Sequence, residues 1–358
     1  MKKKKSMDYT LLCLVLILTV IGLVVLYSTS AYNGLVKFQD PFYYLKKQIF
    51  AVMLGIIMMI VVAKIDYHSW ENIAIIGYIA SIILSVAVMF FGKEYNGSKR
   101  WLSLGPFSFQ PSEFSKVALI IFLAWLVCKN VEHIDRWRIL LKIMIPVLPI
   151  VGLVGMSNLS TAIIILGIGG ILIFIASPKY LQFIVIAVIG VSFLGIFLAL
   201  ESYRLERIAI WRNPELYEKG YQTLQGLYAI GSGGIFGNGF GNSIQKRGFV
   251  PEAQNDMIFS IICEEFGVVG ACCIIILFIV LIYRFFLVAM RCKDLFGTLI
   301  VTGVMVHIML QVLLNIAVVT NTIPNTGITL PFVSYGGTSV MFLMIEMGLV
   351  LSVSDLVQ

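Results

Sequence analysis

The chain has 358 residues, of which 59% are hydrophobic and only 13% are charged, and its mean hydropathy is +0.96. Its formal net charge is +7. A soluble protein of this length needs far more charged surface, so the composition excludes a soluble globular enzyme. We therefore expect an all-α polytopic membrane protein that forms a single integral membrane domain over 1–358.

Apolar runs that are long enough to cross a bilayer predict about ten transmembrane helices. These runs lie at 9–27, 48–63, 72–92, 114–128, 139–155, 160–176, 180–200, 258–288, 297–320 and 338–354. Helices one to seven would occupy 1–200 and helices eight to ten 258–358. Between them, 201–257 would form a long extracytoplasmic loop.

Basic residues near the helix ends predict the orientation of the chain in the membrane. Short segments with Lys2 to Lys5, Lys64, Lys129, Arg136 and Arg138 favour the inner side, as do Lys179, Arg284, Arg291 and Lys293. Both termini would then be cytoplasmic, and the long segments 93–113 and 201–257 would lie outside. The outer set of cations would either meet an anionic headgroup or phosphorylated lipid or simply keep the loop soluble.

The loop 201–257 is not uniform. Amphipathic spacing with aromatic residues predicts an interfacial helix over Glu201–Trp211, and a second short helix is expected over Tyr221–Gly231, closed by glycines. The connection 321–337 contains two prolines and three glycines, which forbid a regular helix. It is either a plain turn or, because irregular backbone at membrane depth needs protein or water around it, the wall of a cavity.

Asp256 stands where the polar segment 239–256 runs into the hydrophobic helix at 258. In the first turn of that helix, amide dipoles would stabilise its ionised form, and this capping role is the simplest interpretation. However, a lone ionised acid in a polar cleft could also accept a proton from an attacking hydroxyl. Ser260 and Glu264 fall on roughly the same helical face.

Other polar residues in or near the spans give weaker signals. Glu113 and Lys116 are i,i+3 neighbours that could form a pair at the start of helix four. Glu346 must face the bundle interior, toward His307 or Gln311. His307 is expected to be a hydrogen-bonded packing residue, and the six cysteines predict no disulfide framework.

Several motifs resemble the SEDS family, the FtsW/RodA/SpoVE group, over nearly the whole chain. They include Asn96-Gly-Ser-Lys-Arg-Trp101, Gln110-Pro-Ser-Glu-Phe-Ser-Lys116, Gly241-Asn-Ser-Ile-Gln-Lys246, Pro251-Glu-Ala-Gln-Asn-Asp256 and Gly327-Ile-Thr-Leu-Pro-Phe-Val-Ser-Tyr-Gly-Gly337, with Gln311 and Asn315. The form of the third motif is closer to the division and sporulation branch, FtsW and SpoVE. There are two departures: Gln254-Asn255 replaces the usual pair before the family's essential aspartate, and Asn158 stands where the family carries an acid.

The resemblance implies an inverting peptidoglycan glycosyltransferase that polymerises lipid II at the outer face of the bacterial cytoplasmic membrane, in cell division or sporulation. It implies Asp256 as the catalytic base, a growing glycan on undecaprenyl pyrophosphate, a class B penicillin-binding protein as partner, contacts with membrane lipid, and no nucleic acid. No cofactor is certain, although a divalent cation, Mg²⁺ or Mn²⁺, could assist. Substrate contacts are expected from Arg100, Glu113, Lys116, Arg204, Arg207, Gln222, Gln225, Lys246, Glu252, Ser334 and Tyr335.

Two other functions use the same features. A flippase for a lipid-linked precursor would need the basic cavity but no general base. A scaffold for a penicillin-binding protein would need only the helices.

Overall fold

The structure is a computed structural model that describes residues 7–95, 98–104, 107–177, 179, 184–185, 187–192, 195 and 202–355. Among these residues, nine helices are long and apolar enough to cross a membrane. They correspond to nine of the ten expected runs. The remaining run, 180–200, lies mostly outside the described residues.

The spanning helices are generally longer than the apolar runs that predict them. They are α1 (Tyr9–Phe38), α2 (Tyr43–Lys64), α3 (Ala74–Phe91), α4 (Pro111–Asn130), α5 (Trp137–Met144) with α6 (Val147–Ser157), α7 (Leu159–Ala176), α11 (Ile258–Arg291), α12 (Leu295–Val319) and α13 (Gly337–Ser354). The 3₁₀ helix η1 (Tyr67–Ile73) extends α3 at its start. Expected boundaries differ most for α1, which continues past the apolar run through polar residues to Phe38.

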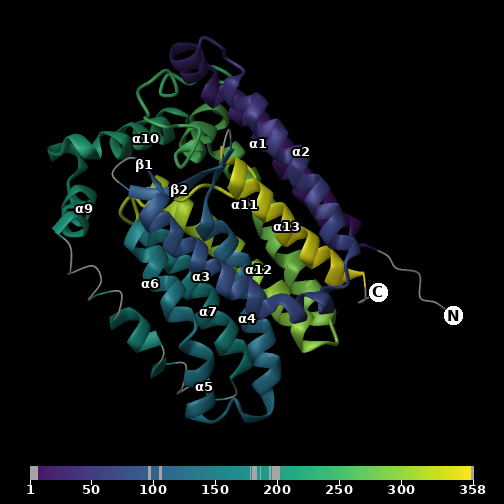
Figure 1. The fold of residues 1–358 in the computed structure, drawn as a ribbon. Coiled ribbons are helices and arrows are strands. Elements are labelled where there is room, and N and C mark those ends of the chain that lie inside the picture. The colour runs from purple at the N-terminus through teal and green to yellow at the C-terminus, as the bar shows by residue number, and fades with distance from the viewer. Residues whose placement is uncertain are drawn as a thin grey trace.

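Helix α12 lies in the middle of the bundle and contacts α4, α7, α11 and α13. Around it, α13 packs along α2, and α1 and α2 form a pair that runs diagonally beside α13 (Figure 1). Glycines allow the close approach of α2 and α13: Gly55 faces Met344, and Gly348 faces Val62. In lipid, no hydrophobic effect drives helices together, so close packing at small residues contributes much of their association.

A small antiparallel sheet, which the sequence did not predict, forms in the connection between α3 and α4. Its strands are β1 (Lys93–Tyr95), β2 (Ser98–Leu104) and β3 (Phe107–Phe109), in the order β1-β2-β3. Thr338 at the start of α13 donates its hydroxyl to the carbonyl of Ser108 at 2.7 Å, which ties the sheet to the bundle.

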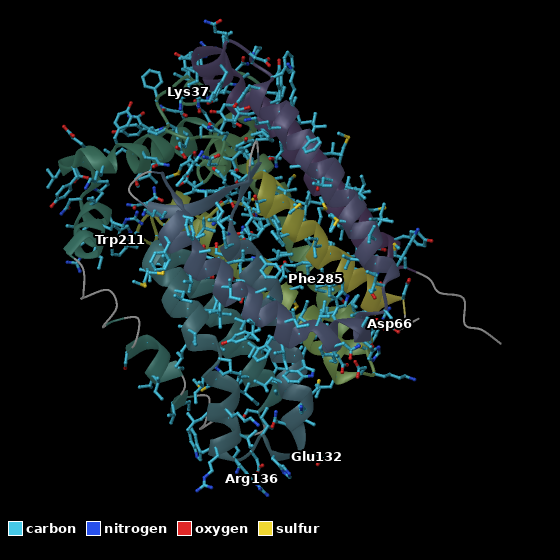
Figure 2. The ribbon with its side chains drawn as sticks, in the orientation of Figure 1. Lys37, Asp66, Glu132, Arg136, Trp211 and Phe285 are labelled. Carbon is cyan, nitrogen blue, oxygen red and sulfur yellow. The ribbon has the colours of Figure 1, made fainter. Side chains whose placement is uncertain are left out.

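The sheet, α9 (Ser202–Arg212) and α10 (Tyr221–Ser232) lie at one end of the bundle, which we call the sheet end, and α5 lies at the other (Figure 1). Lys37 is at the sheet end, and Glu132 and Arg136 are at the opposite end (Figure 2). Both short helices of the loop were expected, and Pro214 begins a 3₁₀ turn between them, η3 (Pro214–Leu216), followed by η4 (Glu218–Gly220).

A glycine-rich loop after α10 is inserted beside a break in α11. Gly267 interrupts that helix with φ 65° and ψ −163°. The amides of Asn238 and Gly239 donate to the carbonyls of Glu264 and Glu265. Those of Val268 and Val269 donate to the loop carbonyls of Gly234 and Ile235. The loop therefore satisfies the backbone groups that the break leaves without helical partners.

The break at Gly267 gives a stability prediction. A Cβ at this position would lie 2.3 Å from the Ile235 carbonyl oxygen, and the positive φ disfavours any side chain. We expect Gly267→Ala to lower the free energy of unfolding by at least about 2 kcal/mol. Gly170→Ala in α7 is the control, because nothing lies within 4 Å of its Cβ position. Thermal unfolding in detergent would compare the two, and equal midpoints would contradict the prediction.

Candidate active site

A cavity of about 1490 Å³ opens at the sheet end, and it is lined by segments from the whole length of the chain. They are α2, the sheet, the starts of α4, α7 and α13, the helices α9, α10 and α12, the 3₁₀ turn η4, and the irregular segments 251–256, 321–329 and 335–336. The expectation that the connection 321–337 forms a cavity wall is therefore confirmed for much of its length.

The lining is strongly basic. Seven cations contribute to it: Lys46, Lys47, Lys93, Arg100, Lys116, Arg207 and Lys219. Among the residues that the structure describes, three acids line it: Glu113, Glu252 and Asp256. An excess of cations in a partly enclosed space concentrates anionic ligands.

Asp256 lies on the cavity lining with only 8% of its surface exposed. Gln222 on α10 donates its amide to Oδ1 at 3.1 Å. The backbone carbonyl of Asp256 accepts a hydrogen bond from Asn315 Nδ2 at 2.8 Å. Helix α10 therefore contacts the carboxyl group of Asp256, and the spanning helix α12 contacts its main chain.

The expectation that the ionised form of Asp256 is favoured at the helix start is wrong for the net effect, although the backbone N–H groups of Asp256 and Met257 do stabilise the carboxylate. Helix α11 begins only at Ile258, after an N-cap at Met257, so Asp256 precedes its first turn. Burial instead disfavours the ionised carboxylate and raises its pKa to about 7, and the nearby negative charge of Glu252 adds to the rise. A carboxyl with a pKa near neutrality can both accept and release a proton under physiological conditions.

The expectation of a lone acid is also wrong, because Glu252 lines the same cavity. Its backbone has φ 50°, a left-handed conformation that costs a non-glycine residue about 1–2 kcal/mol. Asn255 Nδ2 donates to Glu252 Oε2 at 2.8 Å, and the Asn255 amide donates to the Glu252 carbonyl. The strained turn therefore keeps a second carboxylate close to Asp256.

Glu113 and Lys116 form the pair that their spacing predicts. Lys116 Nζ lies 2.9 Å from Glu113 Oε1, and both side chains are almost completely buried at the cavity wall. Neither charge would be stable alone in this position.

The two arginines on the lining help to shape it. Arg100 Nε donates to the carbonyl of Ser157 at 2.9 Å, next to Asn158, which caps α7 through Thr161 N. Arg207 Nη1 donates to the carbonyl of Asn325 at 3.2 Å. Trp211, also on α9, donates its ring N–H to the carbonyl of Asn321 at 2.9 Å. Helix α9 is thus attached to the irregular wall.

Three predicted contact residues do not line the cavity. Lys246 is buried in an ion pair with Glu265, 2.6 Å apart, because an acid inside α11 needs a countercharge. The Ser334 hydroxyl accepts a hydrogen bond from the Leu330 amide and closes a turn of the wall. Gln225 lies on α10 away from the lining.

Of the remaining predicted contact residues, all whose side chains the structure describes line the cavity. Arg100, Glu113, Lys116, Arg207, Gln222, Glu252 and Tyr335 line the cavity with Asp256. Burial raises the pKa of Tyr335 to about 12, so it stays a neutral hydroxyl. The side chain of Arg204 lies outside the described residues.

Sequence reasoning missed several cavity residues, most notably Lys46, Lys47 and Lys93. It expected Lys219 only as one of the outer loop cations that would meet an anionic headgroup or a phosphorylated lipid. The two lysines at the start of α2 had a usable signal, because adjacent cations at a helix entrance lie at the membrane surface. Lys93 gave no such signal, since only the sheet directs it to the cavity.

The other intramembrane polar residues form separate contacts. His307 Nδ1 lies 2.8 Å from Glu346 Oε2, with both side chains fully buried, as expected for His307 as a packing residue. Glu264 accepts hydrogen bonds from the hydroxyl of Ser243 and the amide of Ile244. The described part of the chain holds no group of three or more His, Cys, Asp and Glu residues suited to a metal ion.

Comparison with known proteins assigns the chain to a family. The family profile FtsW/RodA/SpoVE, described as cell cycle protein, matches residues 9–358. The chain belongs to the FtsW/RodA/SpoVE family. It is 38% identical to stage V sporulation protein E of Bacillus subtilis, with 98% of each chain covered. It is 34% identical to a probable peptidoglycan glycosyltransferase FtsW of Trichlorobacter lovleyi, over 97% of this chain and 93% of the relative.

Solved structures agree with this membership. A peptidoglycan synthase complex that coordinates polymerization and crosslinking contains a similar chain, with TM-score 0.81, 28% identity and 98% of each chain covered. The rod shape determining protein RodA of Thermus thermophilus is similar with TM-score 0.72 and 27% identity, over 98% of this chain and 97% of RodA. Like other FtsW/RodA/SpoVE proteins, this is a multi-pass protein of the cytoplasmic membrane.

The Glu113–Lys116 pair gives a second prediction. Lys116→Met leaves the Glu113 carboxylate buried without a countercharge, so the free energy of unfolding should fall by about 3–5 kcal/mol. Lys46→Met is the control, because the Lys46–Asp40 pair is also close, at 2.8 Å, but is largely exposed. Its loss should cost less than about 1 kcal/mol.

Denaturant unfolding in detergent would measure both variants. The double variant Glu113→Gln/Lys116→Met should recover most of the loss, since it leaves no buried charge. If Lys116→Met and Lys46→Met had equal effects, the buried pair would not contribute to stability as we expect.

Proposed function

We propose that the cavity is the site at which this peptidoglycan glycosyltransferase joins lipid II units into glycan strands, with Asp256 as its general base. The observation that carries the proposal is a buried carboxyl with a pKa near 7 in a large cation-rich cavity of a membrane protein. A lipid-linked pyrophosphate substrate needs such a combination of membrane access and positive charge.

In the proposed reaction, Asp256 takes the proton from the 4-hydroxyl of the GlcNAc on the incoming lipid II. That oxygen forms a bond to the anomeric carbon of the terminal MurNAc of the growing chain. The bond from this carbon to the pyrophosphate oxygen breaks, and the electron pair leaves with undecaprenyl pyrophosphate. A single displacement of this kind inverts the anomeric configuration and needs no covalent intermediate.

The cations are suited to the anionic half of the reaction. Charge develops on the pyrophosphate as the bond breaks, and fixed cations around it lower the barrier. Arg100, Arg207 and Lys116 line the cavity and are held by hydrogen bonds or an ion pair, so they need little reorganisation. A divalent cation bound to the pyrophosphate could add to this charge.

The proposed orientation puts the sheet end outside and both termini in the cytoplasm. The connection around α5, at the opposite end, carries Lys129, Arg136, Arg138 and Lys142, as expected for a cytoplasmic loop. The proposed partner is a class B penicillin-binding protein that crosslinks the new strands. Support comes from the similar chain in a complex that couples polymerization to crosslinking.

Replacement of the base tests the function. We expect Asp256→Asn to lower lipid II polymerisation by about 10²- to 10⁴-fold, because the amide cannot accept the hydroxyl proton. Glycan strands made by the purified protein with its penicillin-binding partner would be measured on gels. Asp40→Asn is the control, since Asp40 forms an exposed ion pair and does not line the cavity. Full activity of a folded Asp256→Asn variant would exclude Asp256 as the base.

The pH profile tests the role of Glu252. Because the base must be ionised, kcat/KM should rise with pH through about 7 and then level off. Glu252 raises the pKa of Asp256, so Glu252→Gln should move the rise to lower pH. Gln222→Leu removes a hydrogen bond that favours the carboxylate and should move the rise to higher pH. Shifts in the same direction would contradict the assignment.

A further inference from the structure

In the second half of helix α12, His307, Gln311 and Asn315 are spaced four residues apart on one face. All three are at most 3% exposed. Polar side chains inside a spanning helix are costly unless they have partners or a function. His307 pairs with Glu346, and Gln311 Nε2 donates to the carbonyl of Thr329 at 3.0 Å.

Asn315 differs from the other two because it joins two separate segments. Its Nδ2 donates to the carbonyl of Asp256 at 2.8 Å and to the carbonyl of Ile328 at 2.7 Å. A carboxamide nitrogen has two N–H donors, so both are used. The two carbonyls belong to irregular segments that are far apart in sequence and meet at the cavity.

The second carbonyl is next to the residue that approaches the Asp256 carboxyl. Gly327 has φ 70°, and a Cβ on it would lie 3.9 Å from Asp256 Oδ2. Gly327, next to the carbonyl that Asn315 binds, is therefore a near neighbour of this carboxylate. Any change in the separation of the two segments moves the carboxylate relative to Gly327.

We propose that Asn315 is a positioning residue for glycosyl transfer, which holds the main chain of Asp256 at a fixed distance from the cavity wall at Ile328. It does not touch the substrate and acts through Asp256. The inference rests on the proposed function, in which Asp256 is the base. Small displacements of a catalytic group are enough to matter, since about 1 Å can cost about 10²-fold in rate.

The test compares two buried amides that support the same wall. Asn315→Leu removes both hydrogen bonds of Asn315 and should lower kcat by about 10²-fold with KM for lipid II within about twofold. Gln48→Leu is the matched control. Gln48 is also buried, donates to the carbonyl of Ser334 and accepts from the amide of Gly336, but does not contact Asp256. It should lose similar stability with kcat within about threefold.

A conservative variant covers the case in which Asn315→Leu does not fold. A buried aspartate stays protonated and retains one O–H donor, so Asn315→Asp can restore one of the two hydrogen bonds. We expect the kcat of Asn315→Asp to lie between those of the wild type and Asn315→Leu. If Asn315→Leu does not fold, the kcat of Asn315→Asp should still be about tenfold below that of the wild type. Equal kcat losses in Asn315→Leu and Gln48→Leu, or an unchanged kcat in Asn315→Asp and Asn315→Leu, would overturn the proposal.

A second readout separates this inference from the proposed function. Infrared titration of the Asp256 carboxyl, identified by its loss in Asp256→Asn, does not depend on turnover. Asn315→Leu should raise the pKa of Asp256, because it removes an amide dipole whose positive end faces this residue, and Gln48→Leu should not. An unchanged pKa in Asn315→Leu would overturn the positioning role. An active Asp256→Asn would instead overturn the assignment of the base.

Discussion

Non-helical backbone that is buried among membrane helices must form its hydrogen bonds with protein groups, because little water is present. The wall of the active cavity depends on such hydrogen bonds. The segments 251–257 and 321–336 have few helical or sheet hydrogen bonds of their own. They bond to each other where the Tyr335 amide donates to the Gln254 carbonyl. Buried side-chain amides from the helices, those of Gln48, Gln311 and Asn315, donate to other carbonyls of these segments. A rigid cavity wall results from chain that would otherwise be too polar to bury.

Burial by these packed segments also sets the acid–base properties of Asp256. Because the segments pack closely, Asp256 is shielded from water, and its pKa rises to about 7 although cations surround the cavity. The cations do not cancel the effect: Lys116 is paired with Glu113, and Glu252 adds a negative charge beside Asp256. Base strength and anion binding are therefore set by different parts of one lining.

The glycine loop and the break at Gly267 connect this region to the bundle. Buried Glu264 and Glu265 lie just before the break, and their side chains bind the segment 243–246. The segment that carries Asp256 is thus anchored on both sides: through Lys246 and Ser243 upstream and through α11 downstream. The sequence motif around Lys246 serves this anchoring and not the cavity lining.

The sequence by itself determined the membrane class, nine of the described helices, both short loop helices, the Glu113–Lys116 pair and Asp256 as the candidate acid. These follow from local quantities: the length of apolar runs, helical periodicity, and the cost of charge in a membrane. The tertiary structure alone decided that Lys246 binds Glu265, that Lys93 and Lys219 reach the cavity, and that Asp256 has a raised pKa. Each of these depends on distances between segments far apart in the chain, and burial and charge neighbours do not exist until the helices pack.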